Sequence, residues 1–359
     1  MKLQFAELNY LLPSCIQVEN QDEKMIFSRK VNHIYQFDIT YCSTTLNISF
    51  DTAAKGVVAA KSTAETISEV TITFPETNDL NFITDVYVRV RNFFSFVCNR
   101  KNIGLRGATL CGKYPTKKPD GGKLVDIEYL TTQDIFFSQK YLEPMEPNNK
   151  ISKVLNIRYF STKLKELLQL FFECNEDEEA TVNDSSIHHS FKYRNLIDLE
   201  QSLHITATFE HYVKSLLPEM SSTSTVEFIE DMKEFLDGYI SDTSKSKKKR
   251  EKAKDFQKGL APQISLKDKI KKVYKGYSNW QTLSEAFNEL FEKDDIPVLA
   301  KEANDWRNEL AHDKREYVPN INAIKAIRLL EHMNYAIVLR QAGYSDEEIN
   351  YIIKEILVI

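Results

Sequence analysis

Short runs of β-branched and aromatic residues alternate with Asn, Asp, Gly and Pro over the first 150 residues. This pattern predicts β-strands separated by turns. The clearest runs lie at residues 24–27, 34–41, 45–50 and 70–74. We therefore expect the N-terminal part of the chain to be built mainly of strands.

One segment of this part has a different period. Between residues 79 and 99, apolar side chains recur every three or four positions, at Phe82, Val86, Val90, Phe93 and Val97. That spacing places them on one face of an amphipathic helix. A second apolar stripe at helical spacing lies within residues 161–173, whereas residues 117–122 have the composition of a turn.

After residue 191 the apolar period is helical throughout, which predicts an all-α bundle. The spacing is clearest at residues 196–203, 229–239, 283–290 and 324–337. Ser345 and Glu348 have the spacing of a capping box at the start of a last helix, and Gly343 is placed to end the helix before it.

The two patterns meet at an acidic run that spans residues 173–184. Such a run is typical of a solvated connector; the alternative is a regulatory tail that mimics RNA. We predict an α+β protein in three parts. A β-rich domain with one packed helix spans residues 1–175, an acidic linker spans 176–192, and an all-α domain spans 193–359.

The overall charge argues against a dedicated nucleic-acid-binding protein. The 359 residues include 47 Lys and Arg against 52 Asp and Glu, a net charge of −5, so any contact with RNA has to be local.

Five scattered cysteines lack the paired spacing of zinc or redox motifs and fit a reducing cytoplasm. We expect neither a signal peptide nor a membrane span, because the N-terminus lacks an apolar run and no apolar stretch reaches 18 residues.

A dense basic stretch covers residues 245–275, where 13 Lys and Arg stand against three acids. One interpretation is a solvated loop between two helices. The other is an arm that follows RNA phosphates, with contacts that weaken steeply as salt rises. Because few aromatic residues are interleaved, we do not expect this arm to read a base sequence.

The most informative cluster is Arg307, Asn308 and His312, within two turns of one predicted helix. Arg offers a permanently charged planar fork for a phosphate, His moves a proton near neutral pH, and Asn can orient either group. Asn308 and His312 share one helix face, and we expect Trp306 and Leu310 to anchor the opposite face in a core. The cluster indicates phosphodiester chemistry without a metal; the alternative is a solvated helix face with an ordinary His.

The segment from Arg307 to His312 resembles the Arg, four to six residues, His signature of HEPN ribonucleases, including the polar residue after Arg. Residues 193–201 resemble the first HEPN helix of ApeA-type abortive-infection proteins. Residues 82–113 are similar to a helix-then-strand passage in the domain that precedes HEPN in that group. The resemblance covers most of the chain, and its sharply specific part is the Arg/His motif.

The resemblance implies an endoribonuclease that uses no cofactor and no metal. The ribose 2′-hydroxyl would attack the adjacent phosphorus, Arg307 would hold the charged phosphorane, His312 would act as base or acid, and Asn308 would orient His312 or a phosphate oxygen. It also implies a homodimer or larger even assembly with a composite site. The RNA substrate, with tRNA as one candidate, would be cut in a toxic response to phage, with the N-terminal domain restraining the nuclease until a phage-derived trigger arrives.

Two other functions stay open. One is a non-catalytic HEPN-like module for dimerisation or RNA binding, and the other is a helical scaffold unrelated to RNA. Cleavage of bulk tRNA that depends on Arg307 and His312 would distinguish the enzyme from both.

Three other patterns in the sequence are weaker indications of a functional site. Residues 107–114 nearly spell a phosphate-binding P-loop, but Tyr114 replaces the Ser or Thr that would hold magnesium and Pro115 prevents a helix, so we expect a strand there. Histidines at positions 188, 189, 204 and 211 lack the spacing of metal ligands. Glu200, aligned by the resemblance with a polar position of the first bundle helix, is either a group that supports the motif or an ordinary surface residue.

Overall fold

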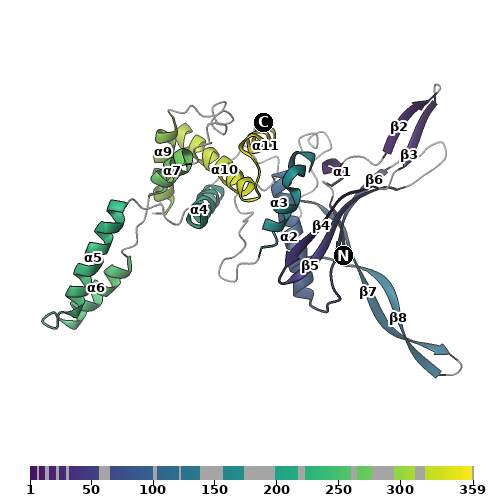
Figure 1. The fold of residues 1–359 in the computed structure, drawn as a ribbon, viewed down its shortest axis with the longest axis horizontal. Coiled ribbons are helices and arrows are strands. Elements are labelled where there is room, and N and C mark those ends of the chain that lie inside the picture. Colours follow the sequence, from purple (N-terminus) through teal and green to yellow (C-terminus); the bar gives the residue numbers. More distant parts are fainter. Residues whose placement is uncertain are drawn as a thin grey trace. The chain divides into compact units, whose positions relative to one another are not determined.

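The computed structural model describes residues 1–5, 8–12, 16–21, 24–29, 32–55, 65–99, 103–120, 123–137, 157–173, 199–216, 223–259, 265–276, 295–311 and 320–357. They form two compact units (Figure 1). The sheet unit combines Met1–Gln201 with Tyr335–Ile359, and the helical unit is Ser202–Asn334. The fold class is α+β, as predicted. The expected division at residues 175 and 193 stays a prediction, because residues 174–198 lie outside the described ranges.

An antiparallel six-stranded sheet forms the centre of the sheet unit. Its strand order is β4 (Asn32–Tyr41), β5 (Thr44–Lys55), β6 (Glu65–Thr73), β1 (Lys2–Phe5), β7 (Leu105–Asp120) and β8 (Lys123–Asp134). A separate hairpin pairs β2 (Ile16–Gln21) with β3 (Lys24–Arg29), and a short helix, α1 (Leu8–Leu11), follows β1. All four strand predictions are confirmed, because each predicted run lies in or overlaps β3, β4, β5 or β6.

Helix α2 (Leu80–Cys98) confirms the predicted helix at residues 79–99. Asp79 caps its start by accepting hydrogen bonds from the backbone N–H groups of Asn81 (2.9 Å) and Phe82 (3.3 Å). Asn99 ends the helix in the left-handed conformation, at φ 50°. The apolar face packs on the sheet, where Phe94 lies 5.6 Å from Phe50 between ring centroids.

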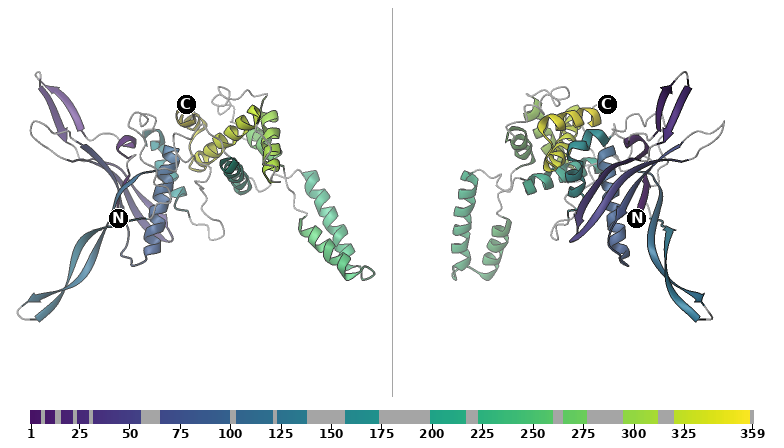
Figure 2. Two further views of the ribbon diagram at one scale, coloured as in Figure 1. Left: turned by 180° about the vertical axis from the view of Figure 1, so that it is seen from behind. Right: turned by 45° about the vertical axis from the view of Figure 1, so that its right-hand side comes forward.

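Strands β7 and β8 form a two-stranded ribbon that continues past the sheet (Figures 1 and 2). Only the first residues of β7, Leu105 to Thr109, pair with β1, whereas pairing with β8 extends to Asp120. The P-loop-like residues 107–114 lie in β7, which confirms the predicted strand. The predicted turn at residues 117–122 is wrong for residues 117–120, which belong to β7 and pair with β8, because the cross-strand pairing extends to Asp120. Residues 121–122 lie outside the described ranges.

The second apolar stripe forms η2 (Ile157–Lys163) and α3 (Leu164–Leu170). The side-chain amide of Gln169 donates to the carbonyl of Thr40 and accepts from its N–H, both at 3.0 Å. Because Thr40 belongs to the edge strand β4, this pair of hydrogen bonds covers part of a sheet edge.

The C-terminal segment packs within the sheet unit. Helix α10 (Ile321–Gln341) reaches it at Tyr335, whose ring stacks on Phe96 with centroids 4.2 Å apart. Tyr344 donates a hydrogen bond of 2.7 Å from its hydroxyl to the carbonyl of Phe160. Burial raises the pKa of the Tyr344 hydroxyl far above its usual range, so it stays protonated and donates.

The predicted end of α10 and start of α11 (Asp346–Leu357) are confirmed. Gly343 follows α10 with φ 86°, a conformation that favours glycine. The N–H of Ser345 donates to the Glu348 carboxylate at 2.8 Å, and the N–H of Glu348 donates to the Ser345 hydroxyl at 3.3 Å. This reciprocal pair is the predicted capping box.

The helical unit contains α4 (Leu199–Leu216) from Ser202 onward, α5 (Thr223–Ser241), α6 (Lys247–Gly259), α7 (Leu266–Gly276), α9 (Ile296–Ala311) and the first part of α10. Its buried side chains include Ile205, Phe209 and Val213 of α4, Ile270 and Val273 of α7, Leu299, Ala303 and Trp306 of α9, and Ile327 and Leu330 of α10. The apolar spacing noted at residues 283–290 lies outside the described ranges.

The interpretation of residues 245–275 as a solvated loop is wrong. Most of this stretch is helical, because α6 and α7 occupy residues 247–259 and 266–276.

In the parts of the chain that the structure describes, no helix combines the length and apolar content that a bilayer crossing requires.

Candidate active site

Helix α9 presents Arg307 and Asn308 to solvent. Its buried face consists of Leu299, Ala303 and Trp306, spaced three or four residues apart, and Trp306 is 3% exposed. This spacing turns the next two residues outward, and both are exposed. Trp306 is therefore the predicted anchor of the motif helix, whereas Leu310 is only half-buried.

The helix ends at Ala311, so Arg307 and Asn308 lie close to its C-terminal end. His312 is the next residue along the chain and lies outside the described ranges. Its place beside Asn308 stays a prediction. A helix C-terminus carries partial negative charge from unpaired carbonyls, which favours the cationic form of an imidazole placed there.

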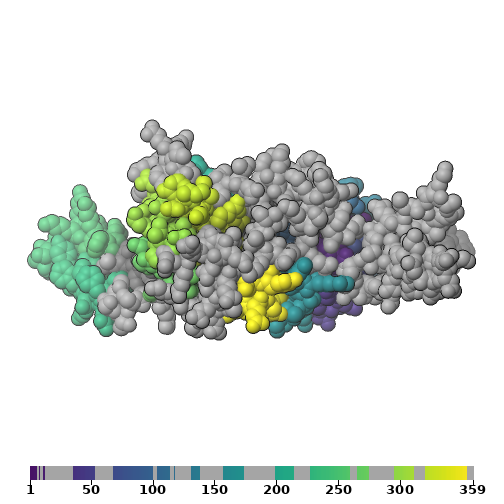
Figure 3. Space-filling view, turned by 90° about the horizontal axis from the view of Figure 1, so that it is seen from above, coloured from purple at the N-terminus to yellow at the C-terminus, as the bar shows by residue number. Residues whose placement is uncertain are grey.

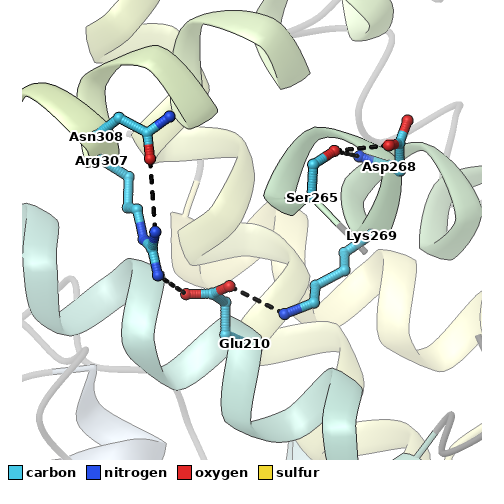
Figure 4. A network of polar contacts seen from close by, with 6 residues as sticks. All are labelled: Glu210, Ser265, Asp268, Lys269, Arg307 and Asn308. Carbon is cyan, nitrogen blue, oxygen red and sulfur yellow. Dashed lines mark hydrogen bonds and ion pairs between the residues drawn. The ribbon is translucent and has the colours of Figure 1, made fainter. Parts of the chain in front are cut away.

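Glu210 of α4 holds Arg307. The carboxylate oxygen Oε2 lies 3.4 Å from Nη2 of Arg307, and Nη1 of Arg307 donates to Oδ1 of Asn308 at 3.5 Å (Figure 4). These long, exposed contacts orient the guanidinium more than they bind it tightly. A guanidinium has five N–H donors, and these two contacts leave others for an oxyanion.

The same carboxylate also binds Lys269 of α7. Nζ of Lys269 lies 2.9 Å from Oε1 of Glu210, so one carboxylate lies between two cations (Figure 4). Glu210, Lys269 and Arg307 together carry a net charge of +1 (two positive charges and one negative). The cluster is therefore a local cationic site on a chain that is acidic overall.

The start of α7 fixes the backbone of Lys269. The hydroxyl of Ser265 accepts from the N–H of Asp268 at 3.2 Å and donates to its carboxylate at 2.6 Å (Figure 4). The N–H of Lys269 donates to the carbonyl of Ser265 at 2.9 Å. This cap holds the first turn of α7, and with it the base of the Lys269 side chain.

Sequence reasoning singled out Glu200 and missed Glu210. Both lie on α4, but ten residues correspond to about 15 Å along a helix, and Glu200 is exposed in the first turn. Glu210 follows the buried Phe209 at the edge of the apolar face of α4. An acidic residue at such an edge is the signal that could have suggested it, and Lys269 could be found only from the packing.

A metal centre finds no support among the described residues. No group of three or more His, Cys, Asp or Glu side chains lies at ligand distance there. His204 and His211 both lie on α4, seven residues apart, and residues 188–189 lie outside the described ranges.

Residues 203–348 match the family model described as Apea-like HEPN. The chain therefore contains an Apea-like HEPN domain, which includes Glu210, Lys269, Arg307, Asn308 and His312. No curated protein and no solved structure matches the chain.

Proposed function

We propose that this protein is an endoribonuclease of the HEPN type, which cuts RNA by attack of the ribose 2′-hydroxyl and acts as a toxic effector in abortive-infection defence against phage. The observation that carries the proposal is the exposed pair of Arg307 and Asn308 near the C-terminal end of α9, where Glu210 of α4 contacts Arg307 and Arg307 donates to Asn308. It lies within the Apea-like HEPN domain, and HEPN domains are generally ribonucleases.

The chemistry requires two proton transfers and one stabilised charge. The 2′-oxygen forms a bond to the adjacent phosphorus, the bond from phosphorus to the 5′-oxygen breaks, and the products carry a 2′,3′-cyclic phosphate and a 5′-hydroxyl. A base removes the 2′-hydroxyl proton and an acid donates a proton to the leaving 5′-oxygen. His312 would perform one of these transfers, a contribution of about 10² to 10⁴ in rate.

Arg307 would stabilise the phosphorane, because charge builds on the non-bridging oxygens as the 2′-oxygen attacks. Glu210 keeps the guanidinium oriented before RNA binds. Lys269 offsets the charge of Glu210, so that the carboxylate does not repel the incoming phosphate. Asn308 would orient His312 or a phosphate oxygen.

The site as proposed needs a second copy of the chain. A single His cannot conveniently remove one proton and donate another in the same pass. Two chains related by a two-fold axis would bring two His312 and two Arg307 side chains together. We propose a homodimer, or a larger even assembly, with a composite site.

The central test uses purified protein and bulk tRNA in the presence of EDTA. We expect the wild type to cut the RNA, and Arg307→Ala and His312→Ala each to reduce kcat/KM by about 10² or more. Lys301→Ala is the matched control, because Lys301 is an exposed cation on the same helix and outside the motif. Binding of RNA without cleavage by the wild type would instead support the non-catalytic module.

The nucleophile has its own test. An oligonucleotide with 2′-deoxyribose at the cut position should resist cleavage, because it lacks the attacking oxygen, while the matched all-ribose oligonucleotide is cut. Cleavage of the deoxy substrate at the same position would contradict the mechanism. Mapping RNA ends after induced expression identifies the RNA, with tRNA as the first candidate.

The defence role predicts a cellular outcome. Cells that carry the wild type should survive phage exposure as a population, through arrest of infected cells, and cells that carry Arg307→Ala should not. Equal phage titres from both cultures would contradict the role. In this scheme the sheet unit restrains the nuclease until a phage-derived trigger arrives.

A further inference from the structure

Helices α5 and α6 form an antiparallel hairpin within the helical unit (Figures 1 and 2). The side-chain amide of Gln257 on α6 donates to the Asp237 carboxylate at 2.7 Å and to the carbonyl of Lys233 at 3.3 Å, both on α5. Between the helices, the N–H of Ser244 donates to Asp242 at 2.8 Å and fixes the turn. Leu236 of α5 and Ala253 of α6 are buried.

Three phenylalanines of this hairpin are exposed although they are large and apolar. Phe228 is 62% exposed, Phe235 is 66% exposed and Phe256 is 59% exposed. Single exposed apolar residues are common on proteins, but a group of aromatic rings on one surface is typical of a binding site. Figure 3 shows the described atoms of the two helices, drawn in green, as one continuous surface.

Helical geometry places the three rings on the same broad face of the hairpin. At about 100° per residue, Phe228 and Phe235 lie about 90° from the inward side of α5, which Leu236 marks. Phe256 lies about 90° from the inward side of α6, which Ala253 and Gln257 mark, in the same rotational sense. Because the two helices run in opposite directions, side chains turned from the inward side in the same rotational sense point to the same face of the hairpin. We call it the phenylalanine face.

Positive charge accompanies these rings. Lys249 and Lys252 of α6 are exposed, and the same geometry turns both toward the side of the phenylalanine face. The same geometry turns one acid, Asp231 of α5, toward that side, and the opposite face carries Glu230 and Asp237 from α5 and Lys254 and Lys258 from α6. Over its whole length α6 has seven Lys and Arg against two acids.

We propose that the phenylalanine face binds a single-stranded segment of RNA, with bases stacked on Phe228, Phe235 and Phe256 and phosphates held by Lys249 and Lys252. Aromatic rings offer a stacking surface to any base, and lysines beside them follow the backbone without reading sequence. A second copy of the chain fits less well, because two lysine-bearing faces would repel each other. The inference rests on the proposed ribonuclease function and adds a substrate-binding surface to it.

The phenylalanines are tested by RNA binding to the full-length chain with His312→Ala, which prevents cleavage from disturbing the measurement. The probe is a fluorescent, unstructured single-stranded RNA of about ten nucleotides, within the range of site sizes typical of such surfaces. We expect Phe235→Ala and Phe256→Ala each to weaken binding by about 5- to 150-fold. Phe235→Tyr should bind as the parent does, whereas Phe235→Leu should lose binding because it keeps the apolar bulk but not the ring.

The lysines are tested by two double variants that remove equal charge. Lys249→Ala with Lys252→Ala should weaken binding and reduce the slope of log Kd against log salt by about 0.7 per lost phosphate contact. Lys254→Ala with Lys258→Ala is the control on the opposite face and should retain tight binding. Circular dichroism of every variant verifies that the helices are intact.

Two outcomes would overturn the inference. The first is RNA binding that is equal in the parent and in Phe235→Leu. The second is a change from dimer to monomer in the phenylalanine variants with RNA affinity unchanged, which would make this face an interface between copies. If the wild type cuts RNA in either case, the proposed function stands and only the binding face is lost. If RNA binding depends on the phenylalanine face but the wild type cuts no RNA, the binding face stands and the proposed ribonuclease function is lost.

Discussion

A carboxylate shared between two cations is the feature of single side chains that most affects the proposed chemistry. Glu210 contacts Arg307 at 3.4 Å and Lys269 at 2.9 Å, and the Arg307 side chain is still 44% exposed. Water therefore screens the pair to Arg307, which is worth about 1 kcal/mol or less. Its main effect is to limit the orientations of the guanidinium.

We expect Glu210→Gln to reduce kcat/KM for RNA cleavage by about five-fold, which corresponds to the loss of an interaction of about 1 kcal/mol. Glu200→Gln is the matched control, because it changes the same residue type on the same helix about 15 Å away. Equal losses in the two variants would show that Glu210 has no special role. The measurement is initial cleavage rate against RNA concentration.

The sequence was sufficient to predict Trp306 as a buried anchor beside a polar edge that carries Arg307 and Asn308, because these positions follow from spacing along one helix. The catalytic roles of Arg307 and Asn308 stay a prediction. The sequence was not sufficient for Glu210 or Lys269. Glu210 and Arg307 are 97 positions apart, and their contact depends on how α4, α7 and α9 pack. A charged residue at the edge of an apolar face has no local signature that names its partner.

Among the elements, those with chemical signals at their ends were predicted best. Asp79 and Asn99 bound α2, and Ser345 with Glu348 starts α11. The basic stretch was predicted poorly, because its charge suggested solvated chain. Lys, Arg, Ala, Glu and Gln are good helix formers, and α6 consists mainly of them. The helix propensity of these residues therefore predicts the structure of α6 better than their charge does.

The capping box gives a stability prediction. Ser345→Ala should lower the free energy of unfolding by about 1 kcal/mol, the usual cost of a lost N-cap. The backbone N–H of Ser345 lowers the pKa of the Glu348 carboxyl from its ordinary value of 4.5, with further hydrogen bonds from Thr162 and Ser345. The folded state therefore binds the proton more weakly than the unfolded state does.

It follows that the contribution of Glu348 is fully present above about pH 4.5 and is lost as the pH falls through its folded pKa. Glu348→Gln should remove this part of the pH dependence. Glu347→Gln, in the same helical turn, is the control and should leave it in place. Urea unfolding between pH 3 and pH 6, followed by circular dichroism, measures both, and equal profiles for the two variants would contradict the assignment.

For the molecule as a whole, the sequence predicted the α+β class but not the return of the C-terminal segment to the sheet unit. Apolar spacing shows that α10 and α11 bury a face, but not which surface covers it. Tyr335 stacks on Phe96 of α2, more than 200 residues earlier in the chain. Contacts of such sequence separation leave no trace in a local pattern.

Tyr335→Ala should destabilise the sheet unit by about 3–5 kcal/mol, the cost of removing a buried aromatic side chain. Hydrogen exchange of the α2 amides measures this directly, and their protection should fall. Tyr351→Ala is the control, because Tyr351 belongs to the same unit but is 52% exposed. Unchanged exchange in α2 after Tyr335→Ala would contradict the packing.

The discontinuity of the sheet unit has a consequence for biosynthesis. A ribosome makes Met1–Gln201 first, then all of Ser202–Asn334, and only afterwards Tyr335 and the residues that follow it. Domains made of one continuous segment can fold as they emerge. Here Phe96 of the sheet unit has to wait for its stacking partner, Tyr335, until the whole helical unit, with Arg307 and Asn308, has been synthesised.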